Sequence, residues 1–384
     1  MNKSLNRELA MILGATAAAI AGIQYARNKK NQRVPKALGL AALGLALLPS
    51  QKTSFRGRSA VITGGSRGLG FAMARELLLQ GAHVTLLARD GDELDRAKAT
   101  LSRLSTAAEH SVFTVICDVT KPEQLDLAFA EARARFGRID LLINNAGSVT
   151  VGPFHSVDDE DIDAQLRLHL LSVIHAIRMV RPYLRQVGGG QIVNISSIGG
   201  KIPMPHMSAY CASKFALGGF SESIAAELKA ENISITTAYP GLMRTGSPKQ
   251  AVFKGDHEKE YAWFALSDVA PGLSVSAESA ARRILSAAKA RRAEVVISIP
   301  AKLGALAHAL VPETFAATMS FVNGFLPTGQ SHERKTGAAS RGLLENQTWA
   351  KPFQARAHEA ERELNQADKT NADFNLGVRP QIPT

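Results

Sequence analysis

Short runs of apolar residues alternate with longer amphipathic stretches from residue 58 to residue 300. Seven of these runs are rich in Val, Ile and Leu and have the length of a strand: 59–63, 83–88, 112–117, 140–144, 191–196, 233–238 and 294–299. Most of the segments between them are long enough to form a helix. Strands that alternate with helices are typical of a parallel sheet covered on both faces. The pattern therefore predicts an α/β fold with a doubly wound parallel sheet of about seven strands.

The N-terminal segment follows a different pattern. Residues 9–26 are almost wholly apolar, and at ~1.5 Å per residue a helix of this length comes close to spanning a bilayer. A basic cluster follows at 27–36, which favours the cytoplasmic side, and a second apolar run at 37–48 is too short to cross alone. We expect residues 1–52 to form a membrane anchor and basic linker, with the catalytic domain facing the cytoplasm. A membrane hairpin, an interfacial pair and a processed start remain alternatives.

Charge and cysteine content exclude several classes of function. Residues 1–58 carry ten Lys/Arg and one Asp/Glu, whereas residues 59–384 carry 35 and 33. The nearly neutral body argues against a basic nucleic-acid surface, so no nucleic-acid partner is expected. Cys117 and Cys211 form no disulfide framework, and no ligand spacing indicates a metal.

The C-terminal part differs in composition from the α/β region. We place the Rossmann-type domain at 53–300 and a C-terminal helical extension with a polar tail at 301–384. An apolar stretch at 300–327 is interrupted by Glu313 and by Pro312, so we expect it to pack on the body or to lie at an interface rather than to span a membrane. The tail after Pro327 is expected to be loosely organised.

A glycine-rich segment, TGGSRGLG at 63–70, follows the first predicted strand and opens a predicted helix. Glycines allow the backbone to approach a pyrophosphate, and the N–H groups of a helix N-terminus bind it. The strand–loop–helix context therefore indicates a nucleotide site. Residues 64–68 also match the G-x-S-x-G motif of serine hydrolases, in which Ser66 would be the nucleophile. Asp268 and His308 would then be its catalytic partners. That alternative leaves the motifs described next unexplained.

Tyr210 and Lys214 lie four residues apart in the segment YCASK, so on a helix they share one face. Together with other motifs they occur in a fixed order: Thr63-Gly64-x-x-x-Gly68-x-Gly70, Asn144-Asn145-Ala146-Gly147, Ser197 thirteen residues before Tyr210, Tyr210-x-x-x-Lys214, and Pro240-Gly241. Over about residues 57–300 the chain thereby resembles the short-chain dehydrogenase/reductase family. The resemblance implies a Rossmann fold and reversible hydride transfer between a nicotinamide cofactor and a carbonyl or hydroxyl group.

The resemblance also implies roles for individual residues. Tyr210 would be the general acid/base, and Ser197 would hold and polarise the substrate oxygen. Lys214 would bond the nicotinamide ribose and, as an ammonium, lower the pKa of the Tyr210 phenol. His169 stands where most family members have an asparagine of a proton relay, and no asparagine occurs between Ser148 and Gln191. We expect the His169 backbone carbonyl to preserve the relay and its imidazole to add a titrating group.

The end of the second predicted strand indicates which nucleotide is used. Ala88 stands at the position where NAD-preferring members carry an acidic residue, and Arg89 and Arg67 suit a 2′-phosphate. The expected cofactor is NADP(H). Its expected contacts are Thr63, Gly64, Ser66, Arg67, Gly68, Leu69, Gly70, Arg89, Asp118, Val119, Asn145, Ala146, Gly147, Tyr210, Lys214, Pro240, Gly241 and Thr245.

The segment after the Pro-Gly turn, residues 242–273, would close over the substrate. It contains Met243, Phe253, Tyr261, Trp263 and Phe264, which favour an apolar carbonyl or alcohol. A homo-oligomer is compatible with the resemblance. The alternative of a different class is a non-catalytic, NADP-binding membrane protein, against which the complete set of Ser197, Tyr210 and Lys214 argues.

Overall fold

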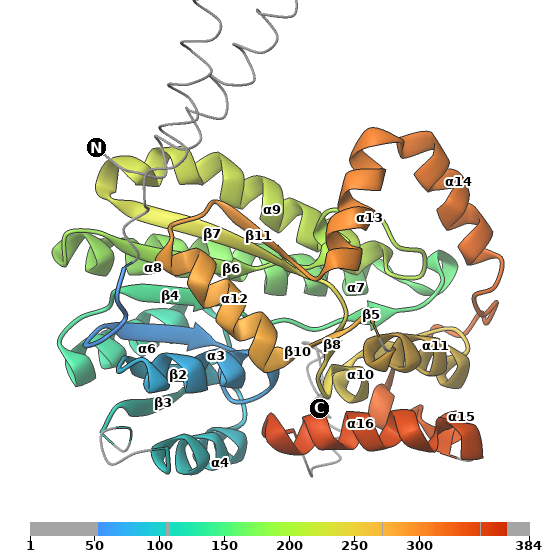
Figure 1. Ribbon diagram of the computed structural model, residues 1–384, viewed down its shortest axis with the longest axis horizontal. Helices are drawn as coiled ribbons and strands as arrows, with labels where there is room; N and C mark the ends of the chain where they lie inside the picture. The colour runs from blue at the N-terminus through green and yellow to red at the C-terminus, as the bar shows by residue number, and fades with distance from the viewer. Residues whose placement is uncertain (1–52, 105–107, 109, 271, 346, 367–384) are drawn as a thin grey trace, which may run out of the picture. The chain divides into compact units, whose positions relative to one another are not determined.

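The computed structural model describes residues 53–366 except 105–107, 109, 271 and 346. A seven-stranded parallel sheet lies at its centre, in the order β11-β7-β6-β4-β1-β2-β3 (Figure 1). The strands are β1 (Ser59–Thr63), β2 (His83–Ala88), β3 (Val112–Ile116), β4 (Leu141–Asn144), β6 (Gly190–Ile195), β7 (Ile233–Pro240) and β11 (Glu294–Ile297). All seven predicted strands and the doubly wound sheet are confirmed.

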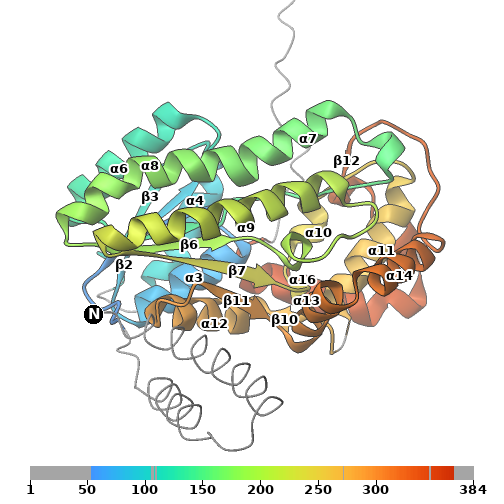
Figure 2. The ribbon, with the colours of Figure 1, turned by 90° about the horizontal axis from the view of Figure 1, so that it is seen from above.

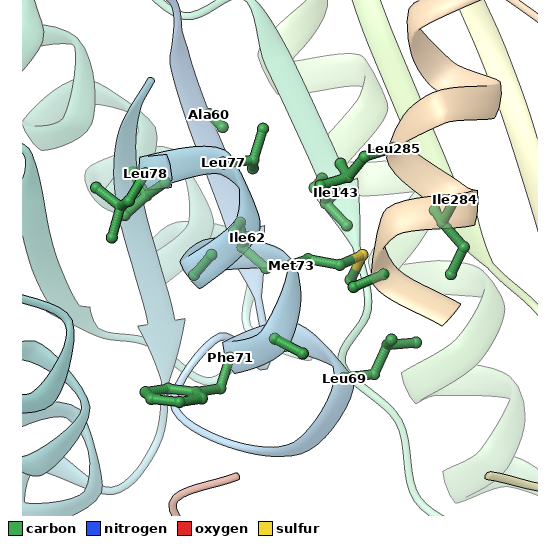
Figure 3. Packing of buried hydrophobic residues seen from close by; sticks show 14 of the residues in the cluster. Ala60, Ile62, Leu69, Phe71, Met73, Leu77, Leu78, Ile143, Ile284 and Leu285 are labelled. Atoms are coloured by element: carbon green, nitrogen blue, oxygen red, sulfur yellow. The ribbon is translucent and has the colours of Figure 1, made fainter. Parts of the chain in front are cut away.

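Helices cover both faces of this sheet (Figure 2). One face carries α3 (Gly68–Leu79), α4 (Gly91–Ser102) and α12 (Ala277–Lys289), and the other carries α6 (Pro122–Phe136), α8 (Ser172–Gln186) and α9 (Ser208–Leu228). Between α3, α12 and the sheet, Ile62, Met73, Leu77 and Leu285 are almost fully buried (Figure 3). Because helices cover both faces of the sheet, the sequences of its strands are nearly continuous runs of apolar residues.

The described residues after Pro327, 328–366 except 346, form helices and a strand, which corrects the expectation of a loosely organised tail for this part. β12 (Lys335–Thr336) pairs with β9 (Val252–Phe253), and β9 pairs with β5 (Thr150–Val151). Further on, α15 (Gly342–Glu345) and α16 (Lys351–Glu363) pack near α11 (His257–Val269). The reason is hydrophobic burial, because Leu344 and Leu364 enter core clusters of the main body.

The helices α13 (Ile299–Leu310) and α14 (Pro312–Asn323) form a hairpin that stands away from the sheet (Figure 1). Its apolar side chains are largely exposed, among them Ile299, Leu303, Leu310, Phe321 and the following Phe325. Only the start of α13 packs on the body, where Ala301 is buried beside β11 and lines the cavity; the expected packing is not found for the rest of this stretch. None of the helices in the described part of the chain combines the length and the hydropathy needed to cross a bilayer. The predicted anchor at 1–52 lies outside the described residues.

Candidate active site

A cavity of about 1090 Å³ opens at the carboxyl ends of the parallel strands. The strand order reverses between β1 and its neighbour β4, and open α/β sheets bind ligands at this point. Of the predicted cofactor contacts, sixteen line the cavity: Gly64, Ser66, Arg67, Gly68, Leu69, Arg89, Asp118, Val119, Asn145, Ala146, Gly147, Tyr210, Lys214, Pro240, Gly241 and Thr245. Ser197 and His169 line it as well.

Thr63 and Gly70 do not line the cavity, and each has a structural task instead. The Thr63 hydroxyl accepts hydrogen bonds from the N–H groups of Asn145 (2.9 Å) and Ala146 (3.1 Å), which joins β1 to the turn after β4. A Cβ at Gly70 would lie 2.1 Å from the Gly64 carbonyl oxygen, so only glycine permits this close packing of helix and loop. Gly64 itself has φ +62°, a conformation that glycine adopts without strain.

Charged side chains gather at the end of β2, where the adenosine end of a dinucleotide is expected. Arg67 and Arg89 both line the cavity, and the charge of Arg89 acts on the pKa of Arg67. Burial lowers the pKa of Arg67, while its ion pair with Glu93 at 2.5 Å opposes this shift. The Ser66 hydroxyl also donates to Glu93, at 3.0 Å. Glu93, three residues after the helix cap Asp90, also lines the cavity, and its place in this site is not predicted from the sequence.

The segment 364–366 crosses the same end of the cavity. The Gly68 N–H donates to the Leu364 carbonyl at 3.0 Å, and the Asn365 amide donates to the carbonyls of Ser66 (2.8 Å) and Glu93 (3.1 Å). Gln366 accepts from the Gly246 N–H at 2.7 Å and lines the cavity. We call residues 364–366 the strap, because they connect the glycine-rich loop with the segment after the Pro-Gly turn.

The other end of the cavity holds the predicted catalytic residues. Helix α9 presents both Tyr210 and Lys214, and the Lys214 ammonium lies 5.7 Å from the centre of the Tyr210 ring. Lys214 Nζ donates to the Ile195 carbonyl at 3.0 Å, at the end of β6. Ser197 follows β6, lines the cavity with Tyr210, and acts to lower the pKa of the Tyr210 phenol. The geometry therefore brings Ser197, Tyr210 and Lys214 together, as the sequence predicts.

The protonation of this group differs from the expectation. Burial raises the pKa of Tyr210, and the nearby Ser197 side chain acts in the opposite direction. Burial also lowers the pKa of Lys214 to about 7, so this amine is not a permanent cation at neutral pH. The expected lowering of the Tyr210 pKa by Lys214 is thus not found, because desolvation of both groups outweighs their interaction.

His169 lies beside the same residues in a π-helical turn, η2 (Arg167–Leu171), between α7 (Asp159–Leu166) and α8. Its Nε2 accepts from the Ser148 N–H at 3.2 Å, so its Nδ1 carries the hydrogen and donates to Ser213 Oγ at 2.8 Å. Its ring packs edge to face on Tyr210, with centroids 5.6 Å apart. Burial and then the charge of Lys214 lower the pKa of His169 well below 6.5. The imidazole is therefore a neutral positioning group, and the expected titration near neutral pH is not supported.

The wall after the Pro-Gly turn is largely apolar. Met243, Trp263 and Phe264 line the cavity as expected, whereas Phe253 and Tyr261 pack into the core cluster behind it. The buried carboxylate of Glu260 fixes this wall: it accepts from Trp263 Nε1 at 2.6 Å and bonds His206 Nδ1 at 2.7 Å.

The serine hydrolase alternative is not assembled in the structure. The Ser66 hydroxyl has Glu93 as its hydrogen-bond partner. The His308 ring packs against Phe315 in the exposed hairpin, with centroids 5.2 Å apart, and does not line the cavity. Asp268 lines the cavity as part of the wall that carries Trp263 and Phe264.

Comparison with known proteins agrees with this geometry. A family model described as short chain dehydrogenase matches residues 58–253. An oxidoreductase of Botryotinia fuckeliana is 39% identical over 184 residues, and a fatty acyl-CoA reductase of Acinetobacter baylyi is 35% identical over 196 residues. These alignments cover 48% and 50% of this chain and 65% of each relative.

A solved structure of L-sorbose reductase from Gluconobacter frateurii, complexed with NADPH and L-sorbose, matches with a TM-score of 0.57 and 27% identity. This match covers 65% of this chain and 97% of that one. Fold, site and matches together place the chain in the short-chain dehydrogenase/reductase family.

The residues of the cavity fit a nicotinamide dinucleotide. The close contact of Gly70 with Gly64 holds the loop against the N-terminus of α3, where backbone N–H groups would bind a pyrophosphate. The Gly68 N–H is already bonded to Leu364, so the N–H groups that follow it would serve. Lys214 and the turn at 145–147 would hold the ribose and nicotinamide side. Such a cofactor would supply the hydride, and the protein would supply its orientation and the proton.

Proposed function

We propose that the protein is an NADP(H)-dependent oxidoreductase that acts on the carbonyl or hydroxyl group of an apolar substrate. The observation that carries this proposal is the convergence of Ser197, Tyr210 and Lys214 in one cavity with the glycine-rich loop. In reduction, Ser197 orients the carbonyl oxygen, Tyr210 gives its phenolic proton to that oxygen, and the substrate carbon receives the hydride. The products are an alcohol and oxidised cofactor, and Tyr210 is reprotonated from solvent.

A protonated, neutral Tyr210 is the form required for reduction of a carbonyl. A phenol whose pKa is raised by burial holds its proton until the carbonyl oxygen gains negative charge. Met243, Trp263 and Phe264 support an apolar substrate, as does the name of the fatty acyl-CoA reductase among the relatives.

The test is a screen of purified protein for NADPH oxidation with ketones and aldehydes of graded chain length. Tyr210→Phe should reduce turnover by at least ~10³-fold while NADPH still binds, because the hydroxyl is the proton donor and the ring also packs. Activity that survives in the phenylalanine variant would remove Tyr210 from the reaction. NADPH binding without turnover of any carbonyl by the unmutated protein would favour the non-catalytic, NADP-binding alternative.

The choice of NADP(H) rests on the pair of arginines and on Ala88 at the end of β2. Glu93 weakens the case for NADP(H), because its carboxylate forms an ion pair with the Arg67 guanidinium and would repel a 2′-phosphate. We expect Arg89→Asp to lower the NADPH/NADH affinity ratio by about 10-fold or more, and Glu93→Gln to raise it several-fold. Dissociation constants from cofactor fluorescence check both changes. Equal affinities for NADPH and NADH in the unmutated protein would contradict the assignment.

We further propose that residues 1–52 tether the protein to a membrane with the catalytic domain on the cytoplasmic side. The support is the apolar run at 9–26 and the basic cluster after it. Exposed apolar side chains on α13 and α14 are compatible with contact to a lipid surface.

A further inference from the structure

Asp268 is a buried acid that the reaction described above does not use. It lies near the end of α11, one turn after Phe264, and only 6% of it is exposed. It lines the cavity together with Trp263, Phe264 and Leu273. Within residues 53–366 as the structure describes them, no side chain or backbone group forms a hydrogen bond or ion pair with its carboxylate.

A second buried acid on the same helix offers a comparison. Glu260 is fully buried, and both of its oxygens are bonded, one to His206 and one to Trp263. Glu260 does not line the cavity. Glu260, behind the cavity wall, thus has hydrogen-bond partners for both oxygens. Asp268, on the cavity side, has no partner among the residues that the structure describes. The Asp268 carboxyl faces the cavity, so a ligand in the cavity can supply a partner for it.

Asp268 also lies near the reacting group. Both Asp268 and Tyr210 line the cavity, and the negative charge of Asp268 is the smallest of the causes that raise the pKa of Tyr210. Burial raises the pKa of Asp268 itself to about 8. A cationic ligand would return it to the carboxylate, because an opposite charge in an apolar site favours the ionised form. A phosphate or carboxylate beside it would be repelled.

We propose that Asp268 binds a protonated amine of the substrate, and that the substrate is an apolar ketone or aldehyde with an amino group close to its carbonyl. The inference rests on the proposed function and defines its substrate class. The ammonium donates a charge-assisted hydrogen bond to Asp268, while the carbonyl oxygen faces Ser197 and Tyr210 and the alkyl part contacts Met243, Trp263 and Leu273. Reduction leaves the amine unchanged: the carbonyl carbon gains the hydride of NADPH and the oxygen gains the Tyr210 proton.

The experiment compares three long-chain ketones that differ only beside the carbonyl: one with an α-amino group, one with an α-hydroxyl group and one with neither. In the unmutated protein, kcat/KM for the amino ketone should exceed that for the plain ketone by about 10- to 100-fold. Asp268→Asn should bring this ratio to within about threefold of unity. Using the ratio within each enzyme removes any effect of the substitution on Tyr210.

Glu260→Gln is the matched control, read from the same ratio within one enzyme. It changes a buried acid on the same helix that does not line the cavity, and the glutamine oxygen can still accept from Trp263 Nε1. It should keep the preference for the amino ketone. A plain ketone or hydroxy ketone used as well as the amino ketone, or a preference that persists in Asp268→Asn, would overturn the assignment.

A second measurement separates this inference from the proposed function. A long-chain primary alkylamine has no carbonyl, so its binding to the NADPH-loaded protein can be measured calorimetrically without turnover. It should bind the unmutated protein about 10-fold or more tightly than the Asp268→Asn variant. If no ketone is reduced but the amine shows this difference, the proposed reaction fails while the amine site stands. Equal binding to both proteins would refute the site.

Discussion

At the scale of single residues, His169 shows how burial decides what a titratable group can do. Both ring nitrogens are engaged, with the Ser148 N–H and with Ser213, and a Cβ on Gly147 would lie 3.1 Å from Nε2. A second proton on Nε2 would break the bond with Ser148 and place a cation beside Lys214. His169 therefore keeps the neighbouring helix and turn in place and contributes no charge of its own.

The expected pH dependence follows from these two groups. Lys214 has a lowered pKa of about 7, so it is a cation below that pH and loses its charge as pH rises through it. We expect kcat/KM for NADPH-linked reduction to fall on the alkaline side with an apparent pKa near 7. His169 stays neutral over pH 6–7, so His169→Asn should keep the same limb and change turnover by no more than about tenfold, or ~1.4 kcal/mol in barrier.

The measurement is the pH profile of kcat/KM for the unmutated protein and the His169→Asn variant with one substrate. A control profile at a second buffer composition excludes specific ion effects. Loss of an acid limb between about pH 6 and 7 in the asparagine variant would show that His169 does titrate during the reaction.

At the scale of elements, the strap joins two walls of the cofactor cleft that are far apart in the sequence. Asn365 has φ +57° and uses its side-chain amide to hold Ser66 and Glu93, while Gln366 holds Gly246. We expect the double variant Asn365→Gly and Gln366→Ala to release NADPH about 10-fold faster, because the side-chain bonds that close the cleft are lost, worth ~1.4 kcal/mol in total. Glycine retains the left-handed backbone conformation, and the buried Leu364 is left unchanged.

Stopped-flow displacement of NADPH measures the release rate. A chain that ends after Gln366 serves as control, since it retains the strap and should release NADPH at the unmutated rate. A double variant with an unchanged release rate would mean that the strap only completes the fold.

The sequence predicts elements whose cause is local and misses contacts whose cause is not. The seven strands follow from apolar runs, and the Tyr210–Lys214 pair follows from helical spacing, because each depends on residues a few positions apart. The strap lies about 300 positions along the chain from its partners at Ser66 and Gly68, and the sequence of residues 364–366 does not predict this contact. From the sequence, Asp268 could be assigned only as the acid of a serine hydrolase. That its carboxylate has no hydrogen-bond partner among the described residues depends on the three-dimensional structure.

At the scale of the whole molecule, one surface and one terminal segment bear on where the protein works. Leu303, Leu310, Phe321 and Phe325 on the α13–α14 hairpin are each more than half exposed, whereas isolated exposed apolar residues occur on many soluble surfaces. The apolar run at 9–26 is a second, independent reason to expect lipid contact. Together they predict two membrane contacts of unequal strength, since a spanning or inserted segment binds far more tightly than an interfacial helix pair.

We expect the full chain to sediment with phospholipid vesicles and a chain that begins at Thr53 to bind them only weakly. Thr53 bonds the Lys289 carbonyl through its N–H at 3.0 Å, so this shortened chain should keep its fold and bind NADPH as the full chain does. Phe321→Ser with Phe325→Ser should remove the remaining vesicle binding of the shortened chain. Phe154→Ser is the matched control, because Phe154 is 74% exposed, similar to Phe325 at 75%, but lies outside the hairpin. Full-length protein that stays in the supernatant without detergent would contradict the tether, and equal loss of binding in the Phe154 variant would show that the hairpin has no special part in it.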